Sequence, residues 1–195
     1  MIEALAVAVR EWIACGGCVI PVATDRSKRP AIAWRELQTQ RPSDDELLAL
    51  FEIDTDGAGL VCGRASGELE MIELEGRAVQ RGMGALLVER LRELQLFELW
   101  QRIVSGYLEA SPGDGLHTLV KISDGVAMPN TVLAATADHE PLIETRGEGG
   151  FTVIAPSFGR SHPTGRPWRL IASICSPQGS MTVTSAPSSA IRPPT

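Results

Sequence analysis

Two glutamates near the middle of the chain have the residue type and the spacing of a metal-binding pair. Glu73 and Glu75 end the segment 69–76 (LEMIELEG), whose short apolar alternation predicts a β-strand. Side chains two residues apart on a strand share one face, so their Cα atoms should lie roughly 7 Å apart. Such close carboxylates repel unless a cation or proton lies between them, and their oxygens suit Mg²⁺ or Mn²⁺. The pair therefore indicates the metal clamp of a phosphoryl-transfer site, with two solvated glutamates as the alternative.

The composition is that of a folded globular chain, because 44% of the 195 residues are hydrophobic and 22% are charged. No apolar run is long enough for a membrane span, and the N-terminal MIE lacks the positive start of a signal peptide, which predicts a cytoplasmic protein. The net charge of −6 argues against a surface that coats nucleic acid. However, residues 146–195 carry five Arg and one acid, and Arg26, Lys28 and Arg29 form another basic cluster. A local anion site is compatible with this distribution.

The periodicity of the sequence predicts both helices and strands. A Ser43 capping box should begin a helix, and residues 58–75 and 141–155 should form two β-hairpins flanking a long helix. This order predicts an α+β fold with a mixed, mostly antiparallel sheet flanked by helices. We expect a domain over residues 1–172 and a flexible Ser/Thr/Pro-rich tail or linker over 173–195. The remaining elements are helices at 2–15, 44–51 and 77–104, strands at 18–22, 105–111 and 116–122, and a connecting loop at 123–140.

A third acid and a histidine extend the candidate site. Glu144 and Arg146 should share a face of the second hairpin, and we predict that Glu144 converges with Glu73 and Glu75 although 69 residues separate it from Glu75. His117 begins a strand after a Pro-Gly-Asp-Gly turn, and a lone histidine there is more often structural than a ligand. The CxxC pair of Cys15 and Cys18 has no second ligand pair for zinc, so free thiols are the better interpretation.

The order of five segments resembles the N-terminal primase/polymerase (prim-pol) domain of phage and plasmid replication proteins, in the archaeo-eukaryotic primase superfamily. Each segment alone is weakly specific, but their order and spacing across residues 5–170 are fairly specific. Both members of the first acid pair are Glu, where the family usually leads with Asp. The segments are GCVIP at 17–21, KRPAIAW at 28–34, Gly59–Gly63 with Glu73-Leu74-Glu75, SPGDGLH at 111–117, and IETRGEGGF at 143–151 with Ala155-Pro156-Ser157.

The resemblance implies an archaeo-eukaryotic primase (RRM-like) catalytic domain that performs template-directed nucleotidyl transfer, as a DNA primase and DNA polymerase. It implies Mg²⁺ or Mn²⁺ on Glu73, Glu75 and Glu144 in a two-metal mechanism, with His117 as a further catalytic residue, and no zinc. The implied partners are a single-stranded DNA template, dNTP or NTP and a C-terminal helicase region, with no membrane, in the cytoplasm of a bacterial host of a phage or plasmid. The candidate nucleotide-binding residues are His117, Arg146, Ser111, Lys28, Arg29, Arg160 and Arg166.

Two other classes of function remain open from the residues alone. A non-catalytic nucleotide- or nucleic-acid-binding module on the same fold would bind nucleotide without turnover. A metal-dependent phosphodiesterase or nuclease would use the same carboxylates and would degrade DNA without dNTPs.

Overall fold

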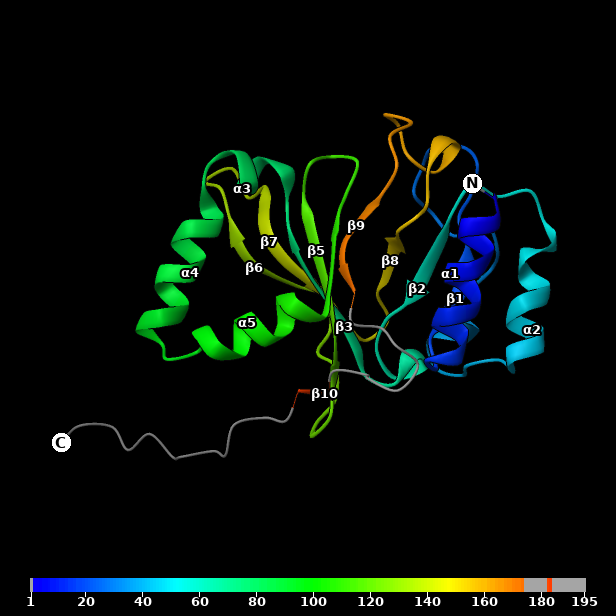
Figure 1. Ribbon diagram of the computed structural model, residues 1–195, viewed down its shortest axis with the longest axis horizontal. Coiled ribbons are helices and arrows are strands. Elements are labelled where there is room, and N and C mark those ends of the chain that lie inside the picture. Colours follow the sequence, from blue (N-terminus) through cyan, green and yellow to red (C-terminus); the bar gives the residue numbers. More distant parts are fainter. Residues whose placement is uncertain (1, 174–181, 184–195) are drawn as a thin grey trace.

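The computed structural model describes residues 2–173 and 182–183, and their strands form two sheets (Figure 1). The small sheet is antiparallel, and all of its β1 and β2 residues are buried. Helices α1 (Ile2–Ala14) and α2 (Asp44–Ala49) lie beside it. In order across the sheet, its strands are β1 (Cys18–Pro21), β2 (Ala58–Val61) and β8 (Phe151–Ile154).

The large sheet carries the remaining strands and is bordered by the helices drawn in green in Figure 1. Its neighbouring strands are antiparallel, except that β10 (Thr182–Val183) pairs in parallel with β5. Its order is β6 (Thr131–Ala135), β7 (Pro141–Arg146), β3 (Leu69–Leu74), β5 (Leu116–Ile122), β4 (Tyr107–Ala110) and β9 (Arg169–Ser173). These pairings confirm the α+β class and the mostly antiparallel pairing, although the strands divide between two sheets.

The main hydrophobic core lies between the small sheet, α1 and one face of the large sheet. Met71 of β3 is 1% exposed and packs in the same cluster as Leu60 and Ile154 of the small sheet. Because strand residues alternate faces, Glu73 lies on the face of Met71, beyond the apolar contacts. The core therefore fixes the direction in which the first acid points.

Both predicted hairpins are wrong, because each pair of strands is divided between the two sheets. Strand β2 pairs with β8, and β3 pairs with β7, so the chain crosses from the small sheet to the large one after β2 and returns after β7. A single bridge between Gly63 and Leu69 is what remains of the first expected hairpin. The crossings touch, since a Cβ on Gly63 (φ +78°) would lie 2.7 Å from Cα of Glu148. Each strand thus pairs with a strand far away in the sequence, and closeness along the chain did not predict these strand partners.

Three shorter helices replace the single helix expected over 77–104. They are α3 (Gly76–Gln80), α4 (Met83–Glu93) and α5 (Phe97–Gly106). The breaks coincide with left-handed backbone at Gly82 (φ +72°) and Gln95 (φ +59°). Because α5 continues through Gly106, the strand expected from 105 begins only at Tyr107.

Two further expectations concern loops and the C-terminus. The expected loop at 123–140 contains β6. The tail predicted at 173–195 lies outside the described residues, apart from Ser173 and β10.

The Ser43 capping box is present, with Ser43 and Glu46 each bonding the backbone N–H of the other. Among the described residues, no helix is both long enough and apolar enough to cross a membrane. Short 3-10 helices complete the fold at Glu36–Gln38, Leu50–Glu52, Arg64–Ser66 and Gly159–Ser161.

Candidate active site

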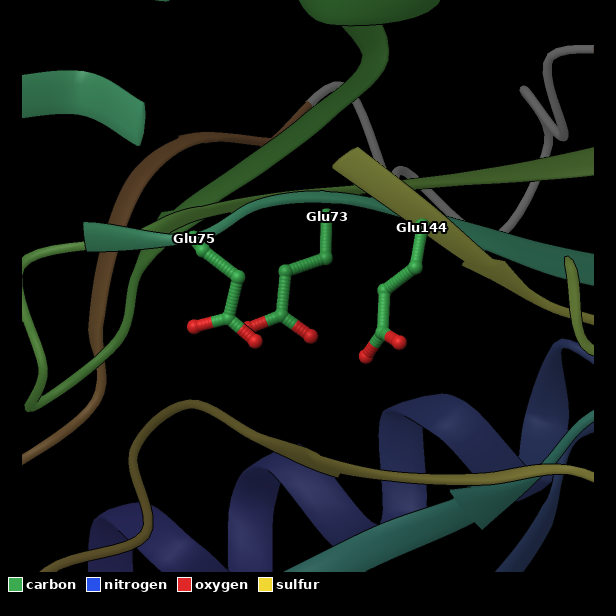
Figure 2. A group of neighbouring side chains, drawn as sticks. All are labelled: Glu73, Glu75 and Glu144. Atoms are coloured by element: carbon green, nitrogen blue, oxygen red, sulfur yellow. The ribbon is translucent and has the colours of Figure 1, made fainter. Parts of the chain in front are cut away.

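The three predicted acids meet on one face of the large sheet. Glu73 on β3 and Glu144 on β7 are direct cross-strand partners, and Glu75 follows the end of β3 as the N-cap residue of α3. One carboxylate oxygen from each lies within 4.8 Å of the others, and Figure 2 shows the three side chains pointing the same way. The structure therefore brings together the residues whose convergence we predicted. Three carboxylates this close form an oxygen donor set that fits Mg²⁺ or Mn²⁺.

The carboxylates of Glu73 and Glu75 have different electrostatic surroundings. Burial alone would raise the pKa of Glu73, but the hydrogen bond and charge of His117, with Arg146 and Lys28, hold it below its usual value. Burial and the charge of Glu73 raise the pKa of Glu75, and Arg77, 4.0 Å away, only partly offsets them. The negative charge of Glu75 is thus the less well compensated of the two. A divalent cation would relieve this repulsion.

A row of ionisable side chains crosses four adjacent strands at one level of the large sheet. Glu144 on β7 faces Glu73 on β3, Glu73 faces His117 on β5, and His117 faces Glu109 on β4. The His117 imidazole bridges two acids, with Nε2 3.1 Å from Glu73 Oε1 and Nδ1 2.8 Å from Glu109 Oε1. Burial alone would lower its pKa, yet the hydrogen bonds to Glu109 and Glu73 raise it to about 10.

Glu109 is the residue of this row that the sequence analysis missed. Its side chain is 1% exposed, and it lies on a four-residue strand among Tyr107, Leu108 and Ala110. In the sequence, the signal is an acid among the apolar residues of a short predicted strand, because a carboxylate buried there requires a partner. Its pairing with His117 follows from the strand register, which the sequence alone did not fix.

A cavity of about 450 Å³ lies against Glu73 and Glu75. This volume is within the usual range for a small-molecule site. Aromatic side chains of Trp34 and Phe151 line part of the cavity, with ring centroids 5.7 Å apart. Of the predicted nucleotide-binding residues, the cavity is lined by Lys28, Arg29, Ser111, His117 and Arg146.

The basic loop before Pro30 is shaped by its own hydrogen bonds. The backbone N–H of Ser27 donates to Asp25, and that of Arg29 donates to the hydroxyl of Ser27. Lys28 adopts a left-handed conformation (φ +62°), so the loop turns sharply within the segment 27–30, which lines the cavity. The loop thus places Lys28 and Arg29 in the lining of the cavity that Glu73 and Glu75 share.

Two predicted nucleotide ligands lie outside the cavity lining. Arg160 donates to both Asp54 and Asp56, each at 2.9 Å, which fastens the 3-10 segment Gly159–Ser161 to the chain before β2. Arg166 donates to the Pro112 carbonyl and to Asp114 at 3.0 Å. Their guanidinium groups are thus engaged by protein acceptors, and Arg166 fastens the turn whose Pro112 lines the cavity.

Together, the fold and the site define a two-sheet α+β domain in which a carboxylate cluster lies beside a cavity lined by basic side chains. This arrangement is suited to metal-dependent chemistry on phosphates. The chain belongs to the family of bifunctional DNA primase/polymerase N-terminal domains (Prim-Pol), which matches residues 4–187. No curated protein matches the chain. Membership of this family confirms the resemblance. It assigns the domain to primase/polymerase nucleotidyl transfer in general, with DNA and nucleotides as substrates and a typical dependence on divalent metal.

Proposed function

We propose that this domain extends and primes DNA by template-directed nucleotidyl transfer, with Glu73, Glu75 and Glu144 holding Mg²⁺ or Mn²⁺ in a two-metal arrangement. The convergence of these three carboxylates beside a cation-lined cavity carries the proposal. In the reaction, a 3′-hydroxyl oxygen bonds to the α-phosphorus of a nucleotide and pyrophosphate leaves. The bound metal would activate the attacking oxygen and offset charge on the phosphates.

The side chains around the cavity match the parts of a nucleoside triphosphate. Lys28, Arg29 and Arg146 line it and supply positive charge for the phosphates, and guanidinium groups can bind phosphate through two hydrogen bonds. Ser111 lines the same space and adds a hydroxyl for phosphate oxygens. His117 also lines it, and its Nε2 would bind a phosphate oxygen by sharing or exchanging its contact with Glu73. The rings of Trp34 and Phe151 provide the apolar wall on which a base can stack. Charged and aromatic surfaces therefore meet in one cavity next to the acids.

Primer extension on single-stranded DNA tests the proposal against the two other classes of function. The protein is incubated with Mg²⁺ or Mn²⁺, with dNTPs or NTPs, on primed and unprimed templates, beside Glu75→Ala. We expect metal-dependent synthesis by the parent and none by the variant. Degradation of the template without nucleotides would identify a nuclease, and nucleotide binding without synthesis would identify a non-catalytic module. Either of these results would overturn the proposal.

The biological setting is a further part of the proposal and rests on the family alone. We infer a role in phage or plasmid replication in the cytoplasm of a bacterial host, with a helicase region in the full-length protein. ATP-dependent strand separation by the full-length protein tests the second point.

A further inference from the structure

We propose that Glu109 is a positioning residue for nucleotidyl transfer, which fixes the His117 imidazole so that its Nε2 is presented at the edge of the carboxylate cluster. This inference rests on the proposed function. It concerns a buried acid that neither binds the metal nor lines the cavity, and that acts only through the histidine.

The Glu109 carboxylate is itself rigidly held. Its Oε2 accepts hydrogen bonds from the Tyr107 hydroxyl at 2.6 Å and from the Ala155 backbone N–H at 2.7 Å. Its Oε1 remains for His117 Nδ1, at 2.8 Å. Three contacts thus fix the position of both carboxylate oxygens. A carboxylate buried this fully is costly to keep unless partners stabilise it, so Glu109 requires an explanation beyond strand formation.

These contacts determine how the imidazole is oriented. Glu109 Oε1 lies against Nδ1, so the ring is turned with Nε2 toward Glu73, 3.1 Å away. The ring has little freedom to rotate, since the His117 side chain is 7% exposed. His117 is thus held with Nε2 beside an acid that we assign to the metal site.

The same carboxylate also joins the two sheets beneath the site. Ala155 directly follows β8 of the small sheet, whereas Glu109 belongs to β4 of the large sheet. Loss of Glu109 could therefore act by loosening the sheets as well as by releasing His117. A valid test must separate these two effects.

Glu109→Gln and Tyr107→Phe make this separation. Glutamine keeps an oxygen that can accept from Ala155 and Tyr107, but its amide group places a donor against His117 Nδ1. Tyr107→Phe removes one hydrogen bond on the Oε2 side and leaves the Glu109–His117 contact in place. We expect Glu109→Gln to lower kcat/KM for dNTP roughly 10- to 100-fold, the range found for residues that orient metal-ligating histidines, although His117 acts here beside the ligand Glu73. Tyr107→Phe should change it far less.

A double-mutant cycle decides whether Glu109 acts through His117. Glu109→Gln should cause no further loss of kcat/KM in a His117→Ala background, with His117→Gln as the substitute if the alanine variant does not fold. An equal loss in the parent and in that background would show that Glu109 has only a structural role, and would overturn the proposal.

A second readout does not depend on turnover. The chain has three histidines, so the ¹⁵N imidazole signals of His117 can be assigned by their absence from the His117→Ala spectrum. We expect Glu109→Gln to change the Nδ1 signal of the parent, while Tyr107→Phe does not. An unchanged signal in Glu109→Gln would overturn the proposal. If the parent has no polymerase activity, the proposed function fails, whereas this spectrum still decides the role of Glu109.

Discussion

Replacing Glu75 by Gln should stabilise the metal-free protein and weaken its response to divalent metal. Burial and the neighbouring carboxylates raise the pKa of Glu75, so the folded state binds this proton more tightly than the unfolded state does. As the pH rises from the unfolded pKa of Glu75, about 4.3, through its raised folded pKa, the folded state therefore loses stability. Above the folded pKa, the whole free-energy cost of keeping Glu75 ionised in the fold is present. Gln carries no charge and avoids this cost. The gain should disappear below about pH 4.

The expected size follows from the geometry of the cluster. Two unit charges 4.8 Å apart repel by about 3.5 kcal/mol at an effective dielectric constant of 20, and by about 0.9 kcal/mol in water. The Glu75 side chain is 29% exposed and has Arg77 nearby, which favours the lower end of this range. We expect about 1 kcal/mol, or roughly 2 to 4 °C in Tm for a domain of this size. In the parent, metal at 100 times its Kd should add about 2.7 kcal/mol, or roughly 5 to 11 °C.

Thermal unfolding with a chelator and then with increasing Mn²⁺ measures both effects. Glu140→Gln is the matched control, because Glu140 pairs with the same Arg77 at 3.3 Å but lies outside the carboxylate cluster. It should show neither the gain in stability nor the loss of metal response. If Glu75→Gln melts below both the parent and Glu140→Gln in chelator, the repulsion argument is wrong. If metal stabilises all three equally, Glu75 is not a metal ligand.

Three further variants test individual parts of the site. His117→Ala should keep a metal-induced rise in Tm but raise KM for dNTP. Its Tm without metal should fall, because a buried acid loses its partner. An unchanged KM would exclude a contact between His117 and the nucleotide. Arg160→Ala should leave kcat/KM within about twofold and lower only the Tm, because its guanidinium bonds Asp54 and Asp56 outside the cavity. A large loss of activity there would return it to the nucleotide site. Trp34→Ala should weaken binding of nucleotide or template by about 1 to 3 kcal/mol, roughly 5- to 150-fold, and equal affinities in a titration would exclude stacking on this ring.

The sequence was most informative where local physics alone determines structure. The alternation around Glu73 predicted both the strand and the face on which the acids lie, and the capping box located the start of α2. Convergence with Glu144 was also predicted correctly, because both acids lie on strands of similar character. These inferences needed only side-chain alternation and hydrogen bonding between neighbours.

Strand partners and buried networks depended on contacts that sequence proximity does not reveal. β2 pairs with β8 because its fully buried residues fill the middle of the small sheet, and no local signal separates this from a hairpin with β3. Arg160 was predicted to bind phosphate, but the fold places Asp54 and Asp56 against its guanidinium group. Glu109 was not predicted as a site residue, because its partner His117 lies on the neighbouring strand β5 and the sequence does not fix the register of that pair. In each case the missing information was tertiary.

The division between two sheets explains how the cluster can exist at all. Directly opposed like charges such as Glu73 and Glu144 destabilise an ordinary sheet. Here the buried end of the row is compensated, since His117 lies between Glu73 and Glu109, and the less compensated charge gathers at the cavity with Glu75. The small sheet covers the apolar part of the same face through Met71 and its neighbours, and a cavity lies where the acids begin. Repulsion between the carboxylates is thus greatest beside the cavity, where a divalent cation and an anionic substrate can enter. A nucleotidyl transferase would bind both of them at this position.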